Sequence, residues 1–250
     1  MADLFVAEQP GPPGAPRVIL IHGSLDRSTA FMRVARELRD LTVVRYDRRG
    51  YGKSLAVGPS VSFDDQVDDL ASVVGEEPAI VAGHSLGGVV ALAFASRHPP
   101  LVSAVVAYEA PMPWLTSWPS NTAGGVALTD PGDAGDAAEH FMRRIVGDDR
   151  WEELPPRTQA QRRAEGPALV AELRSLRPPH PAPYDLSTFP VPVVAGHGGG
   201  SRPHHKEAAQ RLATTVPRGE LVVIEAASHG AHLSHPREFA DLVRRASALS

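Results

Sequence analysis

The sequence predicts an α/β fold: one mostly parallel sheet of about seven strands, with helices on both faces and a small helical cap. Short runs rich in Val and Ile alternate with stretches of helical period, which is typical of such a sheet. With 250 residues, 42% hydrophobic and 22% charged, the chain can bury one large core. The alternation breaks down once, over residues 111–188, which indicates an insertion.

The expected strands are short, nearly continuously apolar and bounded by Gly, Pro or charged residues. They are residues 17–22, 42–47, 79–83, 102–108, 191–195 and 221–225. Residues 4–8 can add one more strand at the start, and no room remains before it for a further hairpin.

Between these runs, apolar residues recur at the spacing of one helix face, which predicts the flanking helices. The positions are Phe31, Val34 and Leu38; Val67, Leu70 and Val74; residues 86–97; and Phe239, Leu242, Val243 and Ala246.

Residues 111–188 hold all three tryptophans, Trp114, Trp118 and Trp151, together with helical patterns at 139–146 and 158–176. Ligands of open α/β sheets bind at the C-terminal edge of the strands, so a cap at that edge would account for the insertion. We therefore expect a core of residues 1–110 and 189–250 and an inserted cap of residues 111–188. A surface excursion without function is the alternative.

Composition and charge exclude several kinds of partner. The net charge is -4 with no run of Lys or Arg, which argues against binding to nucleic acid or an anionic membrane. There is no cysteine, so neither a thiol nucleophile nor a disulfide exists. No secretory signal or membrane-length apolar run is present, and we expect a cytoplasmic protein, monomeric or homodimeric, acting on a small molecule.

No cofactor is expected. The chain has neither a Gly-x-Gly-x-x-Gly sequence nor a Walker loop, the usual signs of a bound nucleotide. Asp64, Asp65, Asp68 and Asp69 superficially suggest a magnesium site. However, they begin a predicted helix, where carboxylates favour the helix dipole.

The strongest chemical signal is Gly83-His84-Ser85-Leu86-Gly87, a Gly-x-Ser-x-Gly sequence between an apolar strand and a helix. Such a turn exposes its serine on a strained backbone, and glycines on both sides allow the close passage of strand and helix. Ser85 is therefore the predicted nucleophile, and His84 is a candidate for substrate contact. A glycine-rich connection without function is the alternative.

The motifs around Ser85 resemble those of the α/β-hydrolase superfamily. His22-Gly23-Ser24 follows the first long strand, as that family's His-Gly turn does. By this resemblance, the backbone amides of Ser24 and Leu86 would form an oxyanion hole. The segment 47–54 resembles the family's Asp-x-x-Gly-x-Gly-x-Ser loop, which we interpret as structural.

The resemblance places the catalytic base in the C-terminal run Ser228-His229-Gly230-Ala231-His232-Leu233-Ser234-His235-Pro236. His229 lies at the usual distance before the proline that opens the last helix, so it is the expected base. A metal site formed by His229, His232 and His235 is the rival interpretation. We expect no metal, because no carboxylate lies beside this run.

The triad acid departs from the commonest family pattern, since residues 196–203 carry no carboxylate. Haloalkane dehalogenases and related branches carry the acid one strand earlier, and Glu109 follows the strand 102–108 in that way. Glu109 is therefore the expected acid, and Asp185 is its main competitor.

The resemblance implies acyl transfer through Ser85, His229 and Glu109, with hydrolysis of an ester or lactone of a small, fairly apolar molecule. Trp114 and Trp118 could line the acyl pocket, or belong to the core of the cap. A C–C bond hydrolase or a cofactor-free perhydrolase would keep the same residues. A non-catalytic binding protein with the same fold is the rival from another class.

Overall fold

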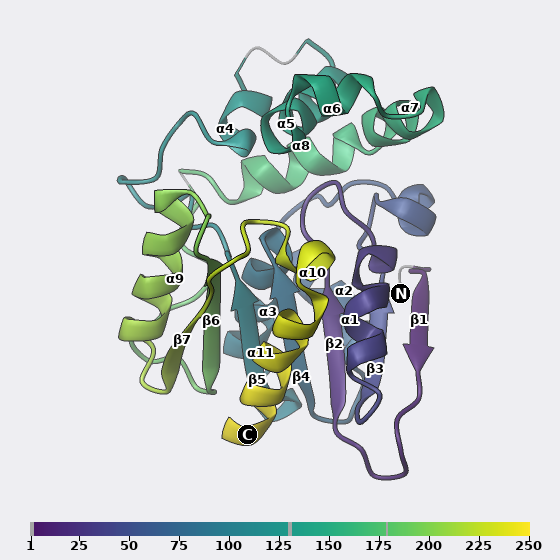
Figure 1. Ribbon diagram of the computed structural model, residues 1–250. Helices are drawn as coiled ribbons and strands as arrows, with labels where there is room; N and C mark the ends of the chain where they lie inside the picture. Colours follow the sequence, from purple (N-terminus) through teal and green to yellow (C-terminus); the bar gives the residue numbers. More distant parts are fainter. Residues whose placement is uncertain (1–2, 130–131, 179) are drawn as a thin grey trace.

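The computed structural model describes residues 3–129, 132–178 and 180–250. A seven-stranded sheet with the order β1-β3-β2-β4-β5-β6-β7 forms its centre (Figure 1). β1 pairs with β3 in the antiparallel direction, and all other neighbours are parallel. The strands are β1 (Val6–Gln9), β2 (Arg17–Ile21), β3 (Thr42–Tyr46), β4 (Ala79–His84), β5 (Val102–Tyr108), β6 (Val193–Gly198) and β7 (Gly219–Ile224). The predicted fold class and strand number are confirmed.

β6 differs from its prediction at both ends. It begins only after Pro192, because a proline cannot donate a hydrogen bond to a neighbouring strand. It also continues through the glycine-rich segment to Gly198, where it pairs with β7 as far as Ile224. This extension carries the backbone of Gly198 to the edge of the sheet where the functional residues lie.

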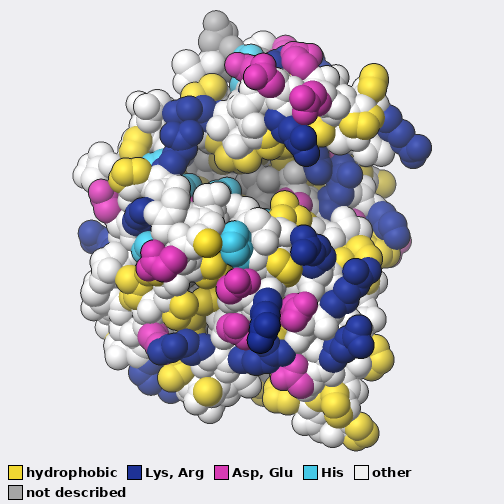
Figure 2. Space-filling model, viewed as in Figure 1, with side chains coloured by type: hydrophobic (Ala, Val, Ile, Leu, Met, Phe, Trp, Pro, Cys, Tyr) yellow, Lys and Arg dark blue, Asp and Glu magenta, His cyan; other side chains and the backbone are white. Residues whose placement is uncertain are grey.

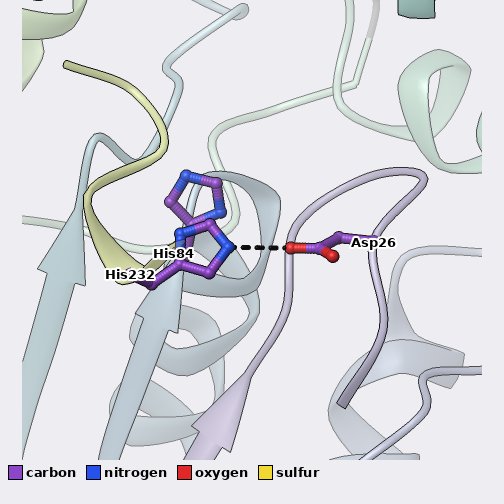
Figure 3. A group of neighbouring side chains, drawn as sticks. All are labelled: Asp26, His84 and His232. Atoms are coloured by element: carbon purple, nitrogen blue, oxygen red, sulfur yellow. Dashed lines mark hydrogen bonds and ion pairs between the residues drawn. The ribbon is translucent and has the colours of Figure 1, made fainter. Parts of the chain in front are cut away.

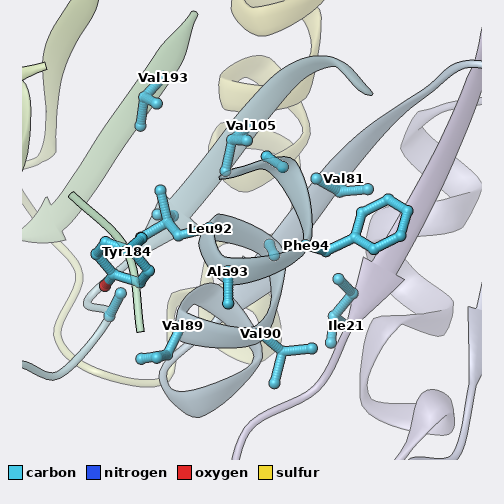
Figure 4. Close-up of a cluster of buried hydrophobic side chains, with 14 of the residues drawn as sticks. Ile21, Val81, Val89, Val90, Leu92, Ala93, Phe94, Val105, Tyr184 and Val193 are labelled. Atoms are coloured by element: carbon cyan, nitrogen blue, oxygen red, sulfur yellow. The ribbon is translucent and has the colours of Figure 1, made fainter. Parts of the chain in front are cut away.

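Helices cover both faces of the sheet, and each face has its own apolar core. One core joins the sheet to α2 (Asp64–Val74), α3 (Leu86–Arg97) and α9 (Pro203–Thr215). The other joins it to α1 (Met32–Glu37) and α11 (Pro236–Leu249). Figure 4 shows α3 packed against the central strands through side chains such as Leu92 and Phe94. This packing fixes the helix that begins directly after Ser85.

Residues 111–188, called the cap below, contain five helices among the described residues. They are α4 (Ala123–Ala127), α5 (Ala134–Val146), α6 (Asp148–Glu152), α7 (Pro156–Ala164) and α8 (Gly166–Ser175). The predicted helix over 158–176 is divided at Glu165, because Pro167 lacks the N–H that a continuous helix would need. Figure 1 shows the cap helices above the C-terminal ends of the parallel strands.

A further short helix, α10 (Ala231–Ser234), follows β7 and leads into α11. Within the described ranges, no helix has the length and apolar character needed to span a bilayer.

Candidate active site

Ser85 occupies a strained turn between β4 and α3. Its backbone has φ 52° and ψ −124°, a conformation that non-glycine residues rarely adopt. A Cβ atom on Gly83 would lie 2.2 Å from the carbonyl oxygen of Gly87, and one on Gly87 would lie 2.2 Å from that of Ile21. Only glycine fits at these two positions, which explains the Gly-x-Ser-x-Gly pattern sterically.

Glu109 and His229 meet at the same sheet edge. Glu109 follows β5 with φ 49°, and its backbone N–H donates to the carbonyl of Gly196 on β6. Its carboxylate Oε2 lies 2.7 Å from Nδ1 of His229, which is in the loop between β7 and α10. The structure therefore brings together the two residues predicted as acid and base, although 120 positions separate them.

The loop that lacks a carboxylate supplies hydrogen-bond donors instead. The backbone N–H of Gly198 donates to Glu109 Oε1 over 3.1 Å, and the Ser201 hydroxyl donates to the same oxygen. No sequence pattern assigns a role to Gly198 or Ser201. The sequence nevertheless held a signal for them. Residues 196–203 lack the carboxylate that this loop usually carries in the family, and Glu109 directly follows the strand 102–108.

Burial by itself would raise the pKa of Glu109, whose side chain is completely buried. The hydrogen bond and charge of His229, the charge of His205 and the Ser201 hydroxyl outweigh burial and lower this pKa to about 2. The carboxylate is thus ionised at neutral pH. It can fix the tautomer of His229 and stabilise its protonated form.

Asp185, the competing acid, is exposed and does not line the cavity that Ser85 and His229 share. Its Oδ1 accepts hydrogen bonds of 2.8 Å from both the N–H and the hydroxyl of Ser187. This local turn occupies the carboxylate, and geometry favours Glu109 as the partner of His229.

A cavity of about 330 Å³ lies between the cap and the C-terminal edge of the sheet. Ser24, Ser85, Leu86 and His229 from the core line it, and Trp118 contributes from the cap. Figure 2 shows the hollow between cap and core, with histidine side chains at its floor. Among the described residues, no acceptor is found for the backbone N–H of Ser24 or Leu86. Both amides are available for the predicted oxyanion hole.

Two predicted substrate contacts lie away from this cavity. Trp114 packs edge-on against Tyr184, with ring centroids 5.6 Å apart, and does not line the cavity wall. His84 is buried behind Ser85, where its Nε2 lies 2.7 Å from the carbonyl oxygen of His229. We correct both assignments: Trp114 belongs to the packing under the cap, and His84 holds the backbone of His229.

His205 lines the cavity and was not predicted as a site residue. Its ring stacks on that of His229 with centroids 4.8 Å apart, and its Nδ1 lies 4.0 Å from Glu109 Oε2. Burial, followed by the charge of His229, lowers the pKa of His205 to about 3. A neutral imidazole therefore lies beside the His229–Glu109 pair at physiological pH.

The histidines of the C-terminal run point to different partners. His232 Nε2 lies 3.0 Å from Asp26 Oδ2, with the ring of His84 against it (Figure 3). His235 contacts Ser234 instead. The rival metal site of His229, His232 and His235 is not assembled.

Among the residues that the structure describes, two other groups of side chains have the spacing to hold a metal ion. They are Asp26 with His84 and His232, and Glu109 with His205 and His229. In each group, a carboxylate already pairs with an imidazole nitrogen within 3.0 Å. An ion would have to replace those hydrogen bonds, including the one between Glu109 and His229.

A buried carboxylate, that of Glu172, links the cap to the core. Glu172 on α8 and Arg48 after β3 are both completely buried and form an ion pair of 2.8 Å. Glu172 Oε1 also accepts hydrogen bonds from Tyr51 (2.7 Å) and from the Ser24 hydroxyl (2.5 Å). Arg48 in turn donates to the backbone carbonyls of the turn that precedes Ser24. This network fixes the segment that carries the Ser24 amide, and no sequence pattern linked Glu172 to it.

Comparisons with known proteins agree with this architecture. Pimeloyl-[acyl-carrier protein] methyl ester esterase of Aromatoleum aromaticum is 31% identical over 216 residues, covering 78% of this chain and 82% of that protein. Carboxylesterase YbfK of Bacillus subtilis is 29% identical over 238 residues, covering 90% and 78%. Lipase LipV of Mycobacterium tuberculosis is 36% identical, but the match covers 42% of this chain and 40% of that protein.

Among solved structures, the enol-lactonase from Burkholderia xenovorans superposes with a TM-score of 0.75 at 19% identity, covering 98% of this chain and 96% of that one. The sequence profile described as "Alpha/beta hydrolase family" matches residues 18–242, nearly the whole chain. Together with the sheet order and the helices on both faces, these matches show that the chain belongs to the alpha/beta hydrolase family.

Proposed function

We propose that the protein is a carboxylic ester hydrolase that cleaves an ester or lactone of a small molecule through Ser85, His229 and Glu109. The observation that carries this proposal is the 2.7 Å contact between His229 Nδ1 and Glu109 beside a cavity that Ser85 and His229 both line. A nucleophile, a base and a carboxylate that orients the base are the parts that acyl transfer requires.

In the first step, Ser85 Oγ attacks the carbonyl carbon and His229 Nε2 accepts the hydroxyl proton. Nε2 is the nitrogen left for this role, because Nδ1 faces Glu109. The carbonyl oxygen becomes an oxyanion, which the amides of Ser24 and Leu86 stabilise by hydrogen bonds. The tetrahedral intermediate then collapses, the bond to the leaving alcohol breaks, and His229 returns the proton to that alcohol.

In the second step, water attacks the acyl-enzyme while His229 accepts one of its protons. Collapse of the second intermediate breaks the bond to Ser85 Oγ and releases the acid, and the proton returns to the serine. Glu109 stays ionised throughout and stabilises the protonated imidazole in both steps. Its low pKa, about 2, is consistent with that role.

The names of the relatives support this reaction class, because two that match most of the chain are called esterases and a structural neighbour is called a lactonase. The cavity wall adds apolar side chains, Phe141, Leu173 and Leu176 among them, which suit an aliphatic acyl group.

The test is a hydrolysis panel of p-nitrophenyl esters of graded chain length, lactones and vinylogous diketones, with Ser85→Ala as the control. We expect ester or lactone hydrolysis by the wild type and none above background by Ser85→Ala. Hydrolysis of the diketones alone would favour the C–C bond hydrolase. No Ser85-dependent turnover of any compound would favour a binding protein.

A further inference from the structure

Three arginines that the proposed mechanism does not use converge on the cavity. Arg144 comes from α5, Arg177 lies just beyond α8, and Arg202 precedes α9. No Asp or Glu lines the cavity among the described residues. The chain as a whole is acidic, with a net charge of -4, so its composition does not explain this concentration of positive charge. Figure 2 shows Lys and Arg side chains along the rim of the hollow.

Several other arginines of the cap are neutralised by ion pairs. Arg163 pairs with Asp136 over 2.6 Å and with Glu139 over 2.7 Å, and Arg143 also pairs with Glu139. By contrast, none of the three cavity arginines forms a salt bridge within residues 3–129, 132–178 and 180–250. Their charge is available to a ligand in the cavity.

Arg177 is the most deeply buried of the three cavity arginines. It is half-buried, whereas Arg144 and Arg202 are exposed at the mouth. In the part of the chain that the structure describes, its guanidinium donates no hydrogen bond to a protein acceptor. Burial lowers the pKa of Arg177. A partly desolvated cation without a partner is costly, and a bound anion would remove that cost.

We propose that the substrate is an ester or lactone that carries a carboxylate group, an inference that rests on the proposed function. Arg177 binds this carboxylate, and Arg144 and Arg202 attract it at the mouth of the cavity. The planar guanidinium matches a carboxylate through two parallel hydrogen bonds. The apolar wall residues, such as Leu173 and Leu176, fit the aliphatic chain between that carboxylate and the reacting ester. A small cavity of about 330 Å³ suits a short half-ester rather than a long-chain lipid.

Two matched pairs of compounds test this substrate class. In the acyl pair, p-nitrophenyl hydrogen glutarate is compared with its neutral methyl ester. In the alcohol pair, the acetate ester of 4-hydroxybenzoate is compared with that of methyl 4-hydroxybenzoate. In at least one pair, kcat/KM for the anionic member should exceed that for the neutral member by about tenfold, the scale of one charge-assisted hydrogen bond.

Arg177→Met removes the charge while keeping an unbranched apolar side chain, and should bring that ratio close to one. Arg174→Met is the matched control: Arg174 is exposed near the end of α8, shortly before Arg177 in the sequence, and does not line the cavity, so the ratio should stay at the wild-type value. A preference for the neutral member in both pairs, or an equal ratio in Arg177→Met and wild type, overturns the inference.

These outcomes are separable from failure of the proposed function. Ser85-dependent hydrolysis of the neutral esters without an anionic preference refutes only the carboxylate inference. Absence of Ser85-dependent hydrolysis of every ester refutes the proposed function itself.

Discussion

Replacing Glu109 by Gln tests the acid through both catalysis and stability. The substitution keeps the shape of the side chain but removes the negative charge that stabilises protonated His229. Because loss of the orienting carboxylate in a serine triad lowers kcat by about ten thousandfold, we expect a loss of a thousandfold or more here. The assay is kcat on an ester that the wild type hydrolyses, with Asp185→Asn as the matched carboxylate control.

The stability effect follows from the lowered pKa of the carboxyl, which is about 2 instead of 4.5. At 1.36 kcal/mol per pKa unit, the ionised carboxyl of Glu109 adds roughly 3 kcal/mol to the free energy of unfolding. This value holds at pH values where the carboxyl is ionised in both the folded and the unfolded state. The sign is that of a depressed carboxyl pKa: the contribution is fully present above the unfolded value of 4.5 and is lost as the pH falls through about 2.

Urea unfolding of wild type and Glu109→Gln measures this contribution, because the other carboxyl groups titrate in both proteins. The difference between their free energies of unfolding should shrink by about 2 kcal/mol between roughly pH 5 and pH 3. A difference that stays constant with pH would refute the link between Glu109 and His229. So would near wild-type kcat in Glu109→Gln together with an inactive Asp185→Asn.

Three further predictions concern the histidine that acts as base, the buried Glu172–Arg48 ion pair and the need for a metal. His229→Ala should lower kcat about as severely as loss of a triad serine. His232→Ala should lower kcat much less, because His232 faces Asp26 rather than the cavity. Steady-state kinetics of both variants test this order, and the reverse order would make His232 the base. Glu172→Gln should lower the free energy of unfolding by about 3 to 5 kcal/mol, because it leaves the buried Arg48 without its carboxylate. Urea unfolding measures this loss, and a loss under about 1 kcal/mol would contradict the importance of the ion pair. Dialysis against a chelator should leave the rate unchanged, whereas activity lost to the chelator and restored by zinc would contradict the metal-free mechanism.

The sequence predicted the fold well, because the strands β2, β4, β5 and β6 are almost entirely buried and therefore appear as nearly uninterrupted apolar runs. Ser85 could be predicted for a steric reason, since the glycines that the strained turn requires are visible in the sequence. Glu109 was expected from the resemblance to family branches that carry the acid one strand earlier, and its place directly after an apolar run agrees with an ionisable residue that needs a partner.

The parts that could not be predicted depend on contacts between distant segments. Glu172 reaches Ser24 and Arg48 from 148 and 124 residues away, and nothing in the helical pattern of the cap distinguishes it from a surface glutamate. For Trp114 the sequence left two roles open, because an aromatic side chain in a cap packs in a core as readily as it lines a cavity; the structure places it against Tyr184. The three cavity arginines come from three separate elements, which only the folded structure brings together.

Labelling with a fluorophosphonate, followed by identification of the modified peptide by mass spectrometry, shows whether Ser85 is an activated nucleophile. We expect one phosphonate adduct on Ser85, no adduct in Ser85→Ala, and labelling of Glu109→Gln that is slower by about the same factor as its loss in kcat. An adduct on another serine, or equally fast labelling of Ser85→Ala, would contradict this expectation.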